Sequence, residues 1–393
     1  MENNNKKKYR VSDIISIAGL LVIIYGFAAA TLIVPDKEFS EDENRYLQQK
    51  PKFSVEALTN GTFTAQIADY FADQFPMRDV FVGAKAVAEI AIQKQENDDV
   101  LLGADGHIIA KEDHPDYTEI DKNLKALKLF DEALGDTDFR VAIAGRSQDT
   151  LLPYMPALYP AKEISDTVFN YVGENLGDVA QINLLDPLRA RVDAGEYVYY
   201  RTDHHWTTLG AYYAYVEIMN AYGMEPYPME HFTRETVSDA FYGTTWSKAG
   251  MKWIGPDSME FFRWEGDDTM VTEIVDNGTT MDGMYDLSYL EVKDKYSAFI
   301  GGNNGRVRIH PADGSPLAKT KRETMVLIKD SFGHSLAPFL AAHFDLEIID
   351  LRYYRTSLFD LVTEIKPERV LVMYNMDSVT NSNSLQMLNL GIR

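Results

Sequence analysis

The sequence predicts an α/β protein in which a parallel sheet is covered by helices on both faces. The first observation is that strand-like runs alternate with amphipathic helix-like segments, which is the pattern of parallel sheets. The second is the composition, with 45% hydrophobic and 25% charged residues, as in ordinary folded proteins. A chain of 393 residues has room for two domains or for one domain with insertions.

The predicted elements form an N-terminal helical part and a longer alternating part. Residues 63–93 carry apolar residues at helical spacing and predict two helices broken at Phe75-Pro76. The segment that starts at Val100 predicts a hairpin turning at 104–106. The alternating part predicts, in order, a helix at 119–134, a strand at 139–145, a helix at 164–176, a strand ending at 186, a helix ending at 223, a strand at 324–328, a helix containing Pro338, a strand at 346–350, a helix at 358–365 and a strand at 369–375.

The acidic balance and the lack of cysteine exclude several classes of function. A net charge of −22 repels a phosphate backbone, and the chain has no concentrated basic stripe, so no nucleic-acid partner is expected. Without cysteine, the chain can form neither disulfides nor thiolate metal sites and has no thiol nucleophile. The 23 Tyr and 4 Trp suit stacking on sugars, although packing is the commoner use of such side chains.

Residues 14–34 predict one membrane-spanning helix. This uncharged stretch of 21 residues would span roughly 30 Å as a helix, which is the thickness of the hydrocarbon core. Basic residues precede it and acidic residues follow it, namely Lys6, Lys7, Lys8 and Arg10 before, and Asp36, Glu38, Glu41, Asp42 and Glu43 after. The charge distribution predicts a cytoplasmic N-terminus and an extracytoplasmic domain. The alternative is a signal peptide cleaved near residues 28–30.

Ser331 is the first candidate for chemistry. It follows the predicted strand at 324–328 and opens the next helix, so its hydroxyl would project from a strand-to-helix turn. The helix N-terminus supplies unpaired N–H groups beside the same oxygen. This arrangement can activate a nucleophile and bind an oxyanion, but Ser331 or Asp330 could also simply cap the helix.

The segment Asp203-His204-His205 is the second candidate, and it allows two interpretations. A serine nucleophile needs an imidazole to take its proton and a carboxylate to orient that imidazole, and Asp203 and His205 could supply both from one turn. The same three residues are competent metal ligands, with His107, His114 or Asp330 available to complete a shell. Adjacent histidines rarely point at one ion, and no HExxH-like spacing occurs, so no metal or other cofactor is expected.

The string TDHHWTTLGAYYAY resembles the signature of the DHHW protein family. Further landmarks agree with that resemblance: SEDENRYLQQKPKF, ADQFPMRD, FYGTTWSKAG, LIKDSFGHSLAPFL and IIDLRYY. DHHW proteins are in turn similar to the alginate O-acetyltransferases. The resemblance therefore implies a three-layer, flavodoxin-like fold of the SGNH-hydrolase type with circularly permuted sequence blocks.

The resemblance also implies roles for individual residues. Ser331 would be the nucleophile, His205 the general base and Asp203 the group that orients the imidazole. The oxyanion-hole glycine of many SGNH enzymes has no clear match in this sequence. Stabilisation of the oxyanion would then rest on the backbone N–H of Ser331 and one side chain. The residues expected to form the oxyanion hole or to bind substrate are Asn375, Tyr374, Tyr353, Tyr354, Arg146, Trp206, His204 and Asp330.

The implied function is acetyl transfer to an envelope or exported polysaccharide by a membrane-anchored extracytoplasmic enzyme. The resemblance implies a multispanning membrane O-acyltransferase as the acetyl donor. With water as acceptor, the same residues would make an acetylesterase. A catalytically idle glycan-binding or assembly subunit is the alternative from a different class.

The expected organisation has six parts. They are a cytoplasmic basic tail (1–13), a transmembrane signal anchor (14–34), a juxtamembrane helical segment (35–98), a first part of the SGNH-like domain with the Asp-x-His block (99–223), an inserted irregular or β-rich lobe (224–322) and a second part with the Ser block (323–393).

Overall fold

The computed structural model describes residues 11–112 and 114–392, and the chain divides into two units between Ala88 and Glu89. The predicted boundary after residue 98 lies close to this point. Residues 1–10 of the predicted basic tail lie outside the described residues.

The first unit contains the apolar helix and a small helical assembly. Its elements are α1 (Val11–Ile33), β1 (Phe39–Ser40), β2 (Arg45–Tyr46), α2 (Val55–Thr59), α3 (Thr62–Asp73) and α4 (Arg78–Ala91), the last of which crosses the boundary. Helix α1 is long and apolar enough to cross a membrane, by length and composition. The predicted break at Pro76 is found between α3 and α4, because proline cannot continue a helix.

The second unit is built on an eight-stranded mixed sheet in the order β11-β10-β12-β14-β13-β15-β6-β7. The five strands from β14 to β7 run parallel, and β12, β10 and β11 extend the sheet antiparallel beyond β14. The strands are β6 (Asp138–Ala144), β7 (Ala180–Asn183), β10 (Met270–Ile274), β11 (Thr279–Asp282), β12 (Arg306–Pro311), β13 (Glu323–Lys329), β14 (Phe344–Ile349) and β15 (Arg369–Asn375).

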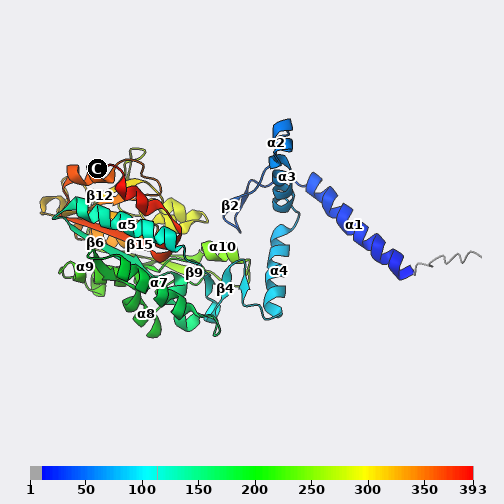
Figure 1. Cartoon of the computed structure of the whole chain (residues 1–393), viewed down its shortest axis with the longest axis horizontal. Coiled ribbons are helices and arrows are strands. Elements are labelled where there is room, and N and C mark those ends of the chain that lie inside the picture. The colour runs from blue at the N-terminus through cyan, green and yellow to red at the C-terminus, as the bar shows by residue number, and fades with distance from the viewer. Residues whose placement is uncertain (1–10, 113, 393) are drawn as a thin grey trace, which may run out of the picture. The chain divides into compact units, whose positions relative to one another are not determined.

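Helices cover both faces of this sheet. The helices of the unit are α5 (Tyr117–Leu134), α6 (Ser147–Thr150), α7 (Ala161–Asn175), α8 (Leu185–Asp193), α9 (Thr208–Ala221), α10 (Thr244–Ala249), α11 (Gly333–Ala341), α12 (Leu358–Ile365) and α13 (Met376–Asn381). Helices α8, α9 and α11 contribute to one hydrophobic core, and α5, α7, α12 and α13 contribute to a second. Figure 1 shows α5 and α9 on opposite sides of β6 and β15. The expected central sheet between two helical layers is therefore present.

Residues 224–322, which the sequence predicts as an inserted irregular or β-rich lobe, contribute strands to the main sheet. They form a hairpin of β8 (Thr233–Phe241) and β9 (Asp257–Arg263), and they also supply β10, β11 and β12 to the main sheet. Because these three strands pair antiparallel and are short, no strand–helix alternation marks them in the sequence. A three-stranded sheet, β3 (Glu96–Asn97), β4 (Val100–Leu102) and β5 (Ile108–Ala110), contains the predicted hairpin.

The parallel strands bring the candidate residues to one edge of the sheet. Strands β14, β13, β15 and β6 all point the same way, so their carboxyl ends meet at one edge, where α/β proteins place their sites. Ser331 follows β13, Asp350 follows β14, Asn375 ends β15 and Arg146 follows β6.

The sheet core predicts a large effect of shortening Leu327. This side chain of β13 is fully buried, so Leu327→Ala should lower the free energy of unfolding by about 2–5 kcal/mol, because apolar area and packing are both lost. Urea unfolding measures the change. The matched control is Leu158→Ala, whose side chain is 96% exposed and should change stability by less than about 0.5 kcal/mol. Equal effects of the two substitutions would contradict this placement of β13.

Candidate active site

Ser331 lies in the turn between β13 and α11 and is partly exposed. Two backbone hydrogen bonds close the turn, from Gly333 N to the Asp330 carbonyl (3.1 Å) and from His334 N to the Ser331 carbonyl (3.1 Å). A Cβ on Gly333 would lie 2.6 Å from the Lys329 Cβ, so only glycine allows α11 to begin this close to the strand. The turn holds the Ser331 hydroxyl at the carboxyl edge of the sheet.

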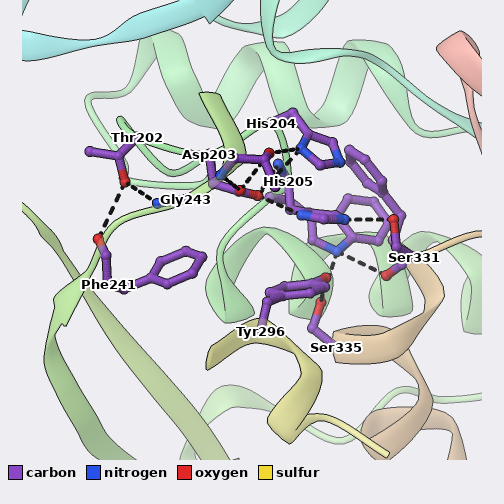
Figure 2. A network of polar contacts seen from close by, with 12 residues as sticks. Thr202, Asp203, His204, His205, Phe241, Gly243, Tyr296, Ser331 and Ser335 are labelled. Carbon is purple, nitrogen blue, oxygen red and sulfur yellow. Dashed lines mark hydrogen bonds and ion pairs between the residues drawn. The ribbon is translucent and has the colours of Figure 1, made fainter. Parts of the chain in front are cut away.

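A hydrogen-bond chain joins Asp203, His205 and Ser331. The His205 Nδ1 lies 2.5 Å from the Asp203 Oδ1, and the His205 Nε2 lies 2.7 Å from the Ser331 Oγ. Figure 2 shows the His205 ring between the carboxylate and the hydroxyl. With one ring nitrogen facing the carboxylate and the other facing the hydroxyl, the imidazole can accept the hydroxyl proton. The structure thus brings together three predicted site residues from two turns that lie 126 residues apart in the sequence.

The Asp203 carboxylate is buried and holds its orientation through several donors. Its Oδ2 accepts hydrogen bonds from the Thr244 N–H (2.7 Å) and the Thr244 hydroxyl (3.0 Å), and its Oδ1 accepts one from the His205 N–H (3.0 Å). Burial alone would raise the pKa of Asp203. The neighbouring charges of His204 and His205, together with these hydrogen bonds, instead hold that pKa below its ordinary value. Asp203 therefore stays ionised and can stabilise a protonated His205.

The His205 imidazole is held in its neutral form. Burial lowers the pKa of His205 to about 4, helped by the nearby charge of His204 and opposed by Asp203. The ring stacks on Tyr296 with centroids 4.0 Å apart and planes inclined by 13°. A neutral imidazole is the form that can take a proton from a hydroxyl. Tyr296 lies in the region expected as a lobe, and the sequence pattern did not single it out.

Trp206 supports the site from inside the core, and it is too buried to contact a substrate as predicted. Its ring is fully buried, and its Nε1 donates hydrogen bonds to the Ser335 Oγ (2.9 Å) and the Phe332 carbonyl (3.2 Å). The Tyr296 hydroxyl also lies 2.9 Å from the Ser335 Oγ (Figure 2). Ser335 thus connects the histidine turn, Tyr296 and α11, and it too was missed by the sequence analysis.

Asp330 accepts hydrogen bonds from two loops and holds them together. An ionised carboxylate has no proton, so it cannot donate a hydrogen bond to an oxyanion. Asp330 accepts hydrogen bonds from the Phe332 N–H (3.0 Å), the Asn375 N–H (2.7 Å) and the Ser378 hydroxyl (2.8 Å). Burial raises the pKa of Asp330, and the hydrogen bonds, which act to lower this pKa, only partly offset the effect. Asp330 therefore ties the Ser331 turn to the end of β15.

Of the two candidates at the end of β15, only Asn375 faces the site. The Asn375 Oδ1 accepts a hydrogen bond from the Asp377 N–H (2.8 Å), and its Nδ2 donates one to the Gly145 carbonyl (3.2 Å). Asn375 also lines the cavity described below. Tyr374 is fully buried in the second core, because alternate residues of a strand face opposite sides of the sheet. Tyr374 is therefore not placed to donate a hydrogen bond to an oxyanion at Ser331.

Tyr353 and Tyr354 lie in the turn after β14. Both backbone N–H groups donate to the Asp350 carbonyl. The Tyr353 ring is half exposed and lies 5.5 Å from the Arg352 guanidinium, whereas the Tyr354 ring packs against the second core. The structure brings neither ring into the hydrogen-bond chain of Ser331.

A cavity of about 240 Å³ adjoins the histidine turn. Its lining residues are Ala110, Glu112, Arg146, Ser147, His204, Thr244, Thr245, Lys248, Asn375 and Asp377. His204 is partly exposed there, with its Nδ1 2.7 Å from the Thr244 hydroxyl. The Arg146 guanidinium is buried and bound through two nitrogens to Asp149 (2.8 and 2.9 Å). Arg146 therefore lines the cavity, and its charge is paired with that of Asp149.

A buried ion cluster lies beside the Ser331 turn. The Lys329 Nζ is 3.2 Å from the Asp350 Oδ2, and Arg352 binds the same carboxylate at 2.9 and 2.6 Å. Burial lowers the pKa of Lys329, against the attraction of Asp350. The sequence analysis missed this cluster because its members come from two neighbouring strands.

The alternative metal site finds little support in the geometry of the proposed ligands. Among residues 11–112 and 114–392, ligand atoms of Asp203, His204 and His205 lie within 4.8 Å of one another. Both ring nitrogens of His205 already face protein groups, and both oxygens of Asp203 accept hydrogen bonds. His107 instead stacks on Tyr154, with ring centroids 3.9 Å apart. His114 and Asp330, the other predicted ligands, are not part of this group.

Comparison with known proteins identifies the family that this chain resembles. Residues 166–349 match the family model described as DHHW protein. The predicted resemblance to the DHHW family is confirmed. The DHHW match covers the histidine turn, the strands added to the sheet and the Ser331 turn.

Two solved structures, a DHHW family protein and PatB1, share the fold of this chain. A DHHW family protein from Eubacterium siraeum has 22% identity and a TM-score of 0.63, over 75% of this chain and 96% of that chain. PatB1 from Bacillus cereus, solved with a sulfonyl adduct, has 19% identity and a TM-score of 0.60, over 72% and 97%. The O-acetyltransferase domain of Pseudomonas putida AlgJ has 15% identity and a TM-score of 0.47, over 74% and 98%. No curated protein sequence matches the chain.

Gly243 provides a test of the packing around Asp203. A Cβ at position 243 would lie 2.2 Å from the Asp203 Cβ, so Gly243→Ala should force the carboxylate from its place and lower the free energy of unfolding by about 1–3 kcal/mol. Urea unfolding measures the change. Gly255→Ala is the control, since a Cβ there meets no atom within 4 Å. Unchanged stability of Gly243→Ala would show that the two backbones are not in close contact.

Proposed function

We propose that the chain is a membrane-anchored, extracytoplasmic O-acyltransferase that moves an acetyl group to a polysaccharide through a Ser331–His205–Asp203 triad. The observation that carries the proposal is the continuous hydrogen-bond chain from carboxylate to imidazole to hydroxyl. The serine is partly exposed, and His204 of the histidine turn lines an adjoining cavity. A helix cap alone would explain the position of Ser331 but not the buried imidazole aimed at it.

The first half-reaction forms an acyl-enzyme. The Ser331 Oγ attacks the carbonyl carbon of an acetyl ester while its proton moves to the His205 Nε2, and Asp203 stabilises the resulting imidazolium. The tetrahedral intermediate collapses with cleavage of the ester bond, and His205 returns the proton to the departing alcohol. The backbone N–H of Ser331 and the positive end of α11 would stabilise the oxyanion, with Asn375, which lines the adjoining cavity, as the candidate side-chain donor.

The second half-reaction passes the acetyl group to the acceptor. A sugar hydroxyl attacks the acetyl-Ser331 carbonyl, His205 takes the hydroxyl proton, and the Ser331 Oγ leaves with that proton. The cavity lined by Glu112, Lys248 and Asp377 offers charged and polar partners for sugar hydroxyls next to His204. The resemblance to alginate O-acetyltransferases supports a polysaccharide acceptor and a multispanning membrane O-acyltransferase as the donor.

Two further features belong to this proposal. The Asp-x-His block precedes the Ser block along the chain, in the order expected for a circularly permuted SGNH-type domain. Helix α1 would serve as the anchor, with the N-terminus in the cytoplasm and the acyltransferase unit outside. The related fold of PatB1, solved with a sulfonyl adduct, suggests a sulfonyl fluoride as a probe of Ser331.

Replacing Ser331 tests the proposal directly. With an activated acetyl ester as donor, Ser331→Ala should lower acetyl release on the order of a thousandfold, because the nucleophile is lost. Ser258→Ala is the matched control, since this exposed serine of β9 lies outside the proposed site and its hydroxyl donates a hydrogen bond to Asp239. Stopped-flow or end-point assays of acetate measure the rate.

The outcomes separate the candidate functions. Equal slow release by the original chain and by Ser331→Ala would favour a non-catalytic glycan-binding subunit and refute the triad. Fast release of free acetate with no acetylated glycan, in the presence of excess polysaccharide, would favour an esterase.

The decrease of kcat/KM at acidic pH tests the protonation state of His205. The base must be neutral, so kcat/KM should hold from neutral pH down to about pH 5 and fall by half near the His205 pKa of about 4. His204→Gln removes a neighbouring positive charge and should move this decrease to higher pH, since His204 lowers the pKa of His205. Circular dichroism at each pH serves as the control for unfolding. A decrease near pH 6.5 in the original chain would contradict the buried, neutral imidazole.

A further inference from the structure

One side of helix α4 is apolar and largely exposed. Val80, Phe81 and Val87 are 59%, 47% and 54% exposed, and Ala84 and Ala88 on the same side are also exposed. These residues recur at spacings of three and four, so they form one continuous stripe along the helix. We call these five residues the α4 stripe.

Two charged residues of α4 lie outside this stripe and contact the unit. Arg78 forms an ion pair with Glu43, and the Asp79 carboxylate lies 3.9 Å from the Lys37 Nζ. Ala86, also outside the stripe, is fully buried. A surface helix of a soluble protein normally turns its apolar residues inward, whereas those of the α4 stripe are exposed.

The N-terminal end of the stripe contacts the apolar helix α1. The Phe27 ring of α1 contacts the rings of Phe81 (centroids 5.7 Å apart) and Phe75 (4.9 Å). Phe27 precedes the last residue of α1, Ile33, by six positions, which corresponds to about 9 Å along the helix axis. A side chain packed on Phe27 is therefore level with the apolar part of α1, not with the polar segment that follows it.

Polar contacts fasten this arrangement where α1 ends. The Tyr70 hydroxyl of α3 donates to the Asp36 Oδ1 (2.9 Å). Gln74, at the end of α3, exchanges hydrogen bonds with the Lys37 backbone, donating to the carbonyl and accepting from the N–H, both at 2.9 Å. These bonds hold the α3–α4 pair against the residues that follow α1.

We propose that α4 lies in the outer interface of the lipid bilayer with the α4 stripe in contact with lipid. The proposal rests on the proposed membrane crossing of α1, since Phe27 then lies inside the bilayer and places Phe81 near the same depth. Lipid is favoured over a protein partner because the stripe continues the apolar surface of α1 through the Phe27–Phe81 contact. An interfacial helix has this composition, with apolar residues on one side and charged residues on the other.

Single-cysteine labelling tests the proposal, because the chain has no native cysteine. The full chain carrying Val87→Cys, Lys85→Cys or Val22→Cys is labelled with an environment-sensitive fluorophore and placed in vesicles of phosphatidylcholine and phosphatidylglycerol. Lys85 lies on the same helix but outside the stripe and is the matched control, and Val22 in α1 reports the membrane crossing. Lipids that carry a quencher near the headgroup or near the bilayer centre report depth.

The expected result is a blue-shifted emission at position 87, quenched by headgroup-level quenchers at least about twofold more than at position 85. Position 22 should be quenched most by the quencher near the bilayer centre. Quenching at 22 with equal, weak quenching at 87 and 85 would overturn the lipid contact and leave the anchor standing. A blue shift at 87 without lipid quenching would overturn it in favour of a protein partner. Absence of quenching at 22 would refute the membrane crossing itself, and with it this inference.

Discussion

The hydrogen bond between the His205 Nε2 and the Ser331 Oγ joins two turns that are 126 residues apart in the chain. Neither turn could hold this distance by itself, since a shift of one ångström would break the bond. The sheet sets the position of Ser331 through β13, and Asp203 sets the direction of the imidazole. Tyr296 fixes the plane of the ring by stacking on it. The chemistry proposed for the chain therefore depends on how accurately the fold holds this one contact.

Buried charges at the carboxyl edge of the sheet are paired rather than isolated. Asp203 accepts hydrogen bonds from His205 and Thr244, and Lys329 and Arg352 share the Asp350 carboxylate. An isolated ion at such a depth would cost several kcal/mol, so each of these groups is stable only with its partner in place.

The sequence identified the residues of the hydrogen-bond chain but not their supports. Asp203, His205 and Ser331 stand out because their residue types sit in turns beside strands and helices. Tyr296 and Ser335 carry no such signal, because a tyrosine or serine in an irregular segment has many ordinary uses. Trp206 was expected to contact the substrate, but it lies in the core. A sequence motif determines which residues are adjacent in the chain, and it does not determine which of their side chains points inward.

Local patterns by themselves determined the apolar helix α1, the break at Pro76, and the alternating strands and helices of the parallel sheet. They did so because hydrophobic spacing and proline act over a few residues. Only the tertiary structure decided that β10, β11 and β12 join the main sheet, because strand pairing is chosen by contacts between distant segments. The same holds for Thr244, which reaches Asp203 across 41 positions of the chain. Distances of that kind are set by packing of the whole core, and no local pattern records them.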